Sequence, residues 1–149
     1  MQNNIPGLKL DFSKSPTIWK FLQDKSFVRG LIGPVGSGKS YACCAEIFKR
    51  AIQQKPSPRD GIKYSRFVIV RNSYPMLKTT TLKTWLELFP EHIYGPVHHS
   101  PPITHHIKLP SRDGAAGIDC EVIFLALDQP KDTRKLLSLE ITGAWINEC

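Results

Sequence analysis

A glycine-rich octapeptide constrains the fold of this chain more than any other stretch. It reads Gly33-Pro34-Val35-Gly36-Ser37-Gly38-Lys39-Ser40, and it matches the pattern of glycine, any four residues, glycine, lysine, and serine or threonine. The apolar residues at 27–32 predict a buried strand before it, and residues 41–53 predict a helix after it. Strand, glycine-rich loop and helix in this order predict a phosphate-binding loop. A chance glycine-rich turn before a helix is the alternative interpretation.

The residue types of this loop suit a nucleoside triphosphate. Gly33, Gly36 and Gly38 permit positive φ angles and a close approach of the backbone to phosphate oxygens. The N–H groups of the loop and of the following helix N-terminus attract anions. We expect Lys39 to reach the β- and γ-phosphates as a catalytic cation, and the Ser40 hydroxyl to bind Mg²⁺. The sequence therefore predicts ATP and Mg²⁺ as cofactors, with a nucleotide cradle made of Gly33, Pro34, Val35, Gly36, Ser37, Gly38, Lys39 and Ser40.

Length and charge narrow the class of protein. The 149 residues suffice for one domain with its own core. No apolar run approaches the ~20 residues that span a bilayer, and the polar N-terminus contains no signal-peptide core, so we expect a cytoplasmic protein without a membrane partner. The net charge of +7, from 20 Lys and Arg against 13 Asp and Glu, favours nucleic acid as partner. A generically basic soluble protein is the alternative.

The cysteines and histidines do not form a recognisable metal motif. No Cys-x-x-Cys pair exists, and neighbouring histidines in a strand point to opposite faces. We interpret the cysteines as reduced packing residues and the histidines as solvated or hydrogen-bonded. The residues concerned are Cys43, Cys44, Cys120 and Cys149, and the pairs His98-His99 and His105-His106.

Hydrophobic periodicity predicts alternating helices and strands. Ser15 and Pro16 resemble a helix start, and three residues of that helix are candidates for an adenine contact, although packing and solvation are the simpler interpretation. The expected elements are a helix at 16–22, strands at 27–32, 66–71, 104–109, 121–127 and 144–148, helices at 41–53 and 82–88, and a short helix within 130–140; the candidate adenine contacts are Trp19, Phe21 and Gln23.

The last predicted strand ends in polar residues that suit the second half of an ATP site. Hydrolysis needs a strand that ends in acidic groups, one near Mg²⁺ and one that orients water. Asn147 stands where Asp is usual. Its side-chain carbonyl is expected to hold a Mg²⁺-bound water with less electrostatic attraction than an Asp carboxylate would exert. Glu148 is the expected general base. An ordinary strand end with a solvent-facing Glu is the alternative.

Taken together, these features resemble the large terminase subunit of tailed bacteriophages, the motor that packages DNA into proheads. The resemblance runs from Phe27 to Glu148. It rests on the loop, the strand ending in Val70-Arg71 with a threonine-rich stretch after it, the hairpin at 104–127, and the segment 133–137 that leads to Gly-Ala-Trp-Ile-Asn-Glu at 143–148.

The resemblance implies an ATPase domain of the additional-strand catalytic glutamate type, followed in that family by a nuclease domain that we expect to be absent here. It also implies double-stranded DNA, a homo-oligomeric ring on a portal protein, and the small terminase subunit as partners, in the host cytoplasm. Some terminases carry an Arg inside the loop. This loop has none, so Arg134, or else Arg71, is the candidate arginine finger.

We therefore predict an α/β P-loop NTPase domain with a mainly parallel sheet flanked by helices and a β-hairpin excursion. Residues 1–26 are expected to form a lead-in and helix, and residues 27–149 a truncated ATPase domain. The expected function is ATP-driven DNA translocation during phage genome packaging. The alternatives are another nucleic-acid-dependent P-loop ATPase of helicase-like type, and a truncated nucleotide-binding module without activity.

Overall fold

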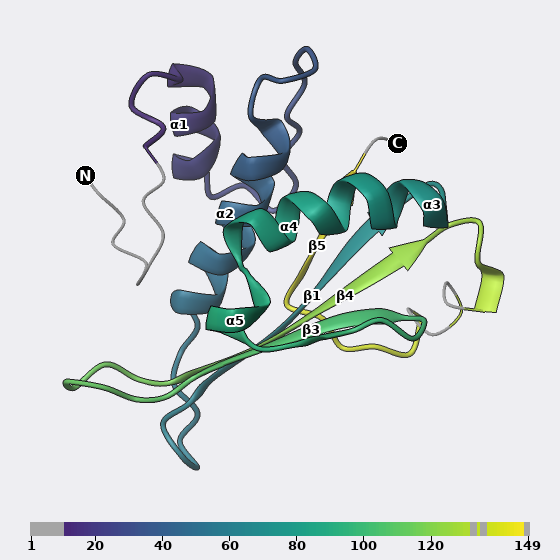
Figure 1. The fold of residues 1–149 in the computed structure, drawn as a ribbon. Coiled ribbons are helices and arrows are strands. Elements are labelled where there is room, and N and C mark those ends of the chain that lie inside the picture. Colours follow the sequence, from purple (N-terminus) through teal and green to yellow (C-terminus); the bar gives the residue numbers. More distant parts are fainter. Residues whose placement is uncertain (1–10, 132–133, 135–136, 148–149) are drawn as a thin grey trace.

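The computed structural model describes residues 11–131, 134 and 137–147. Figure 1 shows an α/β arrangement in which helices lie against one sheet. The elements are α1 (Pro16–Gln23), α2 (Lys39–Ile52), β1 (Lys63–Arg71), α3 (Tyr74–Met76), the π-helix η1 (Leu77–Thr81), α4 (Leu82–Leu88), α5 (Glu91–Tyr94), β2 (Val97–His98), β3 (Ile103–Leu109), β4 (Ile118–Ala126) and β5 (Gly143–Asn147).

The five-stranded sheet is mixed, with the strand order β2-β3-β4-β1-β5. β1 lies between β4 and β5 and is parallel to both, whereas β3 is antiparallel to β4, and β2 to β3. The prediction of an α/β fold is confirmed, but the expected mainly parallel sheet is wrong. The reason is the β3–β4 hairpin, whose short loop requires antiparallel pairing. This hairpin is no excursion, because β4 pairs with β1 along the whole length of that strand.

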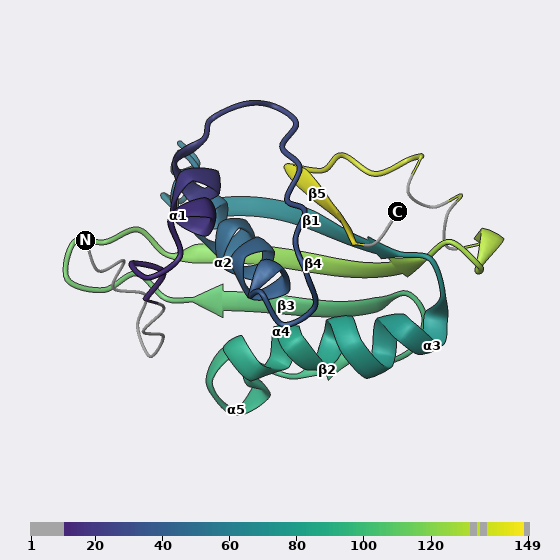
Figure 2. The ribbon, with the colours of Figure 1, turned by 90° about the horizontal axis from the view of Figure 1, so that it is seen from above.

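The main core lies between the sheet and the helices α2, η1 and α4, which cover one face (Figures 1 and 2). Phe48 of α2, Trp85 of α4 and Phe124 of β4 are almost completely buried there. Burial of a side chain of this size contributes about 1.5–3 kcal/mol. The opposite face buries a smaller cluster of β1 and β4 residues against Leu139: Val68, Val70, Ile123 and Leu125. Each strand of this pair therefore alternates its side chains between two apolar layers.

The strand predicted at residues 27–32 is absent. Phe27, Val28 and Ile32 are exposed, and the segment has no regular secondary structure. No backbone hydrogen bond given for the described residues joins 27–32 to another segment. A strand exists through pairing with a neighbour, because its own N–H and C=O groups cannot bond to one another. The apolar composition of this segment is therefore not sufficient to make it a strand in this structure.

The other predicted elements before residue 128 are confirmed with shifted ends. The helix core at 82–88 coincides with α4, and the threonines before it are also helical, in η1. The Thr79 and Thr80 hydroxyls donate to the carbonyls of Pro75 and Met76, four residues earlier. These bonds to the carbonyls four residues earlier satisfy the hydroxyls within the helix. The short α5 and β2 were not predicted.

Several predictions near the C-terminus fall partly or wholly outside the described residues. Residues 130, 131 and 134 are helical, but the rest of the expected helix at 130–140 is not described as one. β5 confirms the last predicted strand as far as Asn147, whereas Glu148 and Cys149 lie outside the description. The described residues contain no helix long and apolar enough to cross a membrane.

The described cysteines are packing residues. Cys43, Cys44 and Cys120 are free thiols, and Cys44 and Cys120 are buried. Burial raises the pKa of Cys43 and of Cys120 to about 11, because it disfavours the thiolate. These cysteines are therefore protonated near neutral pH.

Candidate nucleotide site

The glycine-rich loop adopts the backbone that its sequence predicts. Gly36 and Gly38 have φ angles of 77° and 81°, a region that side chains rarely allow. A Cβ atom at Gly38 would also approach Ile18 Cδ1 to 3.3 Å. Gly33 has no positive φ, but a Cβ there would lie 3.1 Å from Ser37 Oγ. Gly36 and Gly38 are thus needed because of their positive φ angles, whereas Gly33 allows the close approach of Ser37.

The loop leads directly into the N-terminus of α2. Gly38 is the N-cap, no side chain caps the helix, and the first turn carries no acidic residue. The first N–H groups of a helix have no partner within it, and α2 carries 14 residues of aligned peptide dipoles. This helix end is therefore suited to an anion.

Lys39 folds back over the loop. Its Nζ donates to the carbonyl oxygens of Gly33 and Pro34, at 2.6 Å in the second case, and lies 3.3 Å from Ser37 Oγ. The ammonium group thus lies beside the loop backbone. A phosphate bound by the same loop would offer it a charged acceptor, which makes a stronger bond than a neutral carbonyl.

A second polar group lies at the carboxyl ends of β1 and β5. Arg71 and Asn147 occupy matching register positions on these strands. Arg71 Nη1 and Asn147 Nδ2 each donate to Thr81 Oγ1, both at 3.1 Å. The three residues are 5%, 9% and 2% exposed. No sequence pattern distinguishes Thr81 from its neighbours, because it lies in a run of three threonines at 79–81.

The structure brings together some of the predicted site residues and not others. Lys39 and Ser40 begin α2 at the loop, whereas Asn147 and Arg71 meet at Thr81. No hydrogen bond or ion pair given for the described residues joins these two groups. In Figure 1 the loop lies above the N-terminal end of α2, on the side toward which β5 runs. Arg134 is exposed, and no side-chain contact given for it reaches the loop.

The three candidate adenine contacts differ in how accessible their side chains are. Trp19 is 40% exposed on α1. The Phe21 ring carries the Arg29 guanidinium at 4.9 Å, which occupies one of its faces. Gln23 is exposed at the end of the helix. Gln23 is thus solvated, as the simpler interpretation predicted, whereas the exposed Trp19 is not the core residue that this interpretation expected.

The donors and acceptors of the loop fit a triphosphate with Mg²⁺. The uncapped N–H groups and Lys39 match phosphate oxygens, and the Ser40 hydroxyl is a hard oxygen ligand. The described residues contain no cluster of three or more His, Cys, Asp or Glu side chains that would hold a metal alone. Mg²⁺ commonly takes few protein ligands and completes its shell with phosphate and water.

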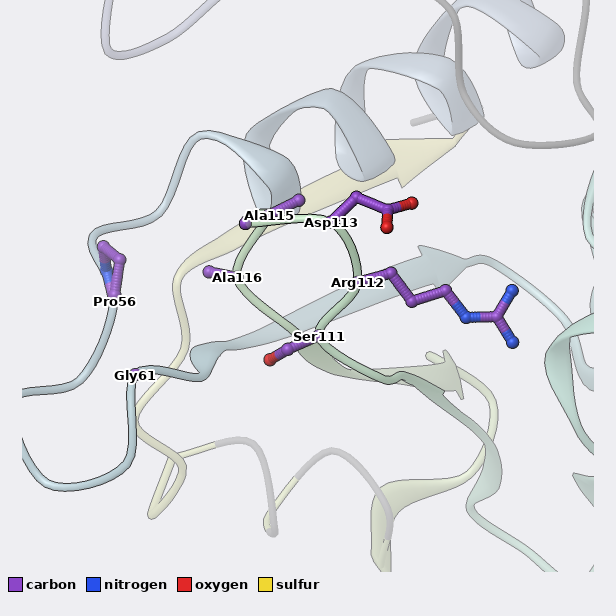
Figure 3. A pocket seen from close by; sticks show the side chains of 8 residues that line it. Pro56, Gly61, Ser111, Arg112, Asp113, Ala115 and Ala116 are labelled. Carbon is purple, nitrogen blue, oxygen red and sulfur yellow. The ribbon is translucent and has the colours of Figure 1, made fainter.

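A hollow of about 370 Å³ lies elsewhere, between the loop before β1 and the loop between β3 and β4 (Figure 3). It is lined by Pro56, Gly61 and residues 111–116. This is the edge at which the parallel strands β1 and β4 begin, whereas Arg71 and Asn147 lie at strand ends. Ligands of α/β sheets bind outside the carboxyl ends of strands, so this hollow is separate from the candidate nucleotide site.

Comparisons with family models, curated proteins and solved structures found no match to this chain. The loop and the polar group at the sheet edge are therefore the features of this chain that indicate a function.

Proposed function

We propose that this chain is a nucleoside-triphosphate-binding domain that holds the phosphates of ATP in the loop at residues 33–40. The observation that carries the proposal is the loop itself: two positive-φ glycines, a lysine folded along the backbone, and an uncapped helix N-terminus in succession. Backbone N–H groups and a helix dipole aimed at one point make an anion site. The lysine and serine that follow are the residues that such loops use for phosphate and Mg²⁺.

We further propose that the domain belongs to an ATP-driven DNA-packaging motor of the terminase type. The resemblance of the sequence to that family and the basic charge support this narrower function. In this proposal Asn147 faces a Mg²⁺-bound water, and Glu148 orients the attacking water. Double-stranded DNA is the translocated partner, and a ring of copies on a portal protein is the working assembly.

The first prediction tests nucleotide binding. Lys39→Ala should weaken the binding of Mg-ATP by at least about tenfold, because a charge-assisted bond to phosphate is lost from the loop. Lys25→Ala is the matched control, since Lys25 is an exposed lysine of the preceding segment and no contact given for the described residues joins it to the loop. Binding of a fluorescent ATP analogue measures both variants. Equal affinity of Lys39→Ala and Lys25→Ala would refute the assignment of the loop.

The DNA-packaging motor, the helicase-like ATPase and the inactive binding module differ in their expected ATP turnover. A nucleotide-binding module is favoured by one observation, the amide of Asn147 in the place of a carboxylate at the end of β5. Phosphate release should be stimulated by duplex DNA if the chain is a motor, by single strands if it is helicase-like, and should be absent if it is a binding module. Glu148→Gln should then retain ATP binding and abolish whatever turnover the wild type shows.

A further inference from the structure

Thr81 holds two strand ends together from a third element. Its Oγ1 accepts one hydrogen bond from Arg71 Nη1 on β1 and one from Asn147 Nδ2 on β5. All three side chains are more than nine-tenths buried. A buried polar group without a partner costs about 1–3 kcal/mol, so the shared hydroxyl constrains both neighbours.

The π-helix places Thr81 at this point. η1 spans Leu77–Thr81, directly after β1 has ended and α3 has turned the chain. Its two preceding threonines, Thr79 and Thr80, are exposed and bond within the helix, whereas Thr81 is buried against the sheet. π-helical turns are rare and are frequent at functional sites. Three neighbouring threonines thus have different roles, and one of them is directed at the strand ends.

The hydrogen-bond inventory then sets the orientation of Asn147. In the structure Thr81 Oγ1 accepts from both partners and so uses both of its lone pairs, and both partners present donors to it. Asn147 therefore turns its NH₂ group toward Thr81. No hydrogen bond given for the described residues engages its carbonyl oxygen Oδ1, which is an acceptor. An acceptor is what a metal-bound water requires, whereas an NH₂ group would repel its protons.

We infer that Thr81 is a positioning residue of the nucleotide site: it fixes the Asn147 amide so that its oxygen, and not its nitrogen, faces the Mg²⁺-bound water of the nucleotide. This inference rests on the proposed function. Thr81 has this role because the residue at the end of β5 is Asn147, an amide, and not a carboxylate. A carboxylate presents oxygen in either orientation, but an amide must be held in one of two.

The first test needs no nucleotide. The side-chain NH₂ group of Asn147 gives its own pair of signals in an amide NMR spectrum, and its exchange with solvent reports on the bond to Thr81. Thr81→Val keeps the branched shape and removes the acceptor, so exchange should accelerate about three- to tenfold. Thr81→Ser should restore the wild-type rate. Thr80→Val is the control, because the Thr80 hydroxyl bonds only to the Met76 carbonyl in the structure.

The second test measures the contribution of Mg²⁺ to ATP affinity, as the ratio of Kd in chelator to Kd in excess Mg²⁺. We expect this ratio to fall about three- to tenfold in Thr81→Val, with the affinity in chelator unchanged. It should be normal in Thr81→Ser and Thr80→Val. An unchanged ratio in Thr81→Val, or an equal loss in Thr81→Ser, would overturn the inference.

The design separates this inference from the proposed function. If wild-type protein shows no Lys39-dependent ATP binding, the proposed function fails, and an unchanged Asn147 exchange rate in Thr81→Val would independently refute the positioning role. If Thr81→Val does not fold, Thr81→Cys replaces it, because a thiol fills the site but accepts hydrogen bonds weakly. Thr81→Cys should likewise accelerate the exchange of the Asn147 NH₂ group and lower the contribution of Mg²⁺ to ATP affinity, and no change in either would overturn the inference.

Discussion

His105 is a fully buried titratable residue whose two ring nitrogens are both engaged. Nδ1 accepts a hydrogen bond from Trp85 Nε1 at 2.9 Å, so the proton is on Nε2, which donates to the Gly95 carbonyl at 2.8 Å. Burial lowers the pKa of His105 from its usual range, and the Gly95 carbonyl and Glu91 only partly oppose this shift. The neighbouring His106 lies on the opposite, exposed side of β3, as the alternation of a strand predicts.

This buried histidine predicts acid sensitivity. In the unfolded chain His105 binds a proton below about pH 6.5, but in the folded protein it does so only at lower pH. The free energy of unfolding should therefore fall as the pH drops below about 6.5, toward the folded pKa. Urea unfolding of the wild type, of His105→Gln and of the exposed control His98→Gln at about pH 7.5 and about pH 5.5 measures the effect. We expect His105→Gln to have the weakest pH dependence, and a dependence equal to that of His98→Gln would contradict the assignment.

At the scale of elements, Arg29 links the segment before the loop, residues 24–32, to the helix after it, α2. Its Nη2 pairs with Glu46 Oε1 of α2 at 2.7 Å, and its Nη1 donates to the carbonyls of Phe21 and Asp24, both at 3.0 Å. Glu46 is buried and also pairs with Arg50 at 2.7 Å. The segment at 24–32, which has no strand partner, is thus held by the Arg29 guanidinium and by Leu31, which packs against the Ile18, Leu22 and Ala42 cluster, and not by a backbone ladder.

Removal of the Arg29 guanidinium should weaken the attachment of residues 24–32, which precede the loop, to α2. Arg29→Met keeps the apolar stem over the Phe21 ring and removes the bonds, and we expect a loss of about 1–3 kcal/mol in unfolding free energy, because Arg50 still pairs with Glu46. Hydrogen exchange should accelerate at residues 24–38 and remain unchanged in β1 and β4. Lys25→Met, an exposed change in the same segment, is the control. Equal exchange in the two variants would show that Arg29 does not hold the segment.

At the scale of the whole molecule, the excess of positive charge is a surface property. Arg59 and Arg66 pair with Asp60 and Glu121, whereas Lys83, Lys108 and Arg112 are exposed without an ion pair given for the described residues. Exposed cations spread over several elements favour a partner that is recognised by charge and not by shape.

Duplex DNA should therefore bind weakly and without sequence preference. If about three phosphates are contacted, an increase in salt from about 50 mM to about 200 mM should raise the Kd about 40-fold, because counterions are released on binding. Fluorescence anisotropy with two unrelated duplexes of equal length measures this. A Kd that is independent of salt, or that differs strongly between the duplexes, would contradict binding through phosphates.

Local patterns in the sequence were sufficient to predict much of this protein. The positive φ angles of Gly36 and Gly38, the helix α2 after them and the strand β1 all followed from residue types and their spacing. Steric freedom at glycine and side-chain periodicity act over a few residues, so they can be read without the rest of the chain. The loop half of the candidate site was predicted for the same reason.

The tertiary structure alone decided the position of the β3–β4 hairpin inside the sheet, the unpaired state of residues 27–32 and the role of Thr81. Each depends on a partner far along the chain: Arg66 of β1 pairs with Glu121 of β4 across 55 positions, and Asn147 reaches Thr81 across 66 positions. A strand, or a buried hydroxyl, is defined by the group it bonds to. That group is set by packing and not by the neighbouring residues.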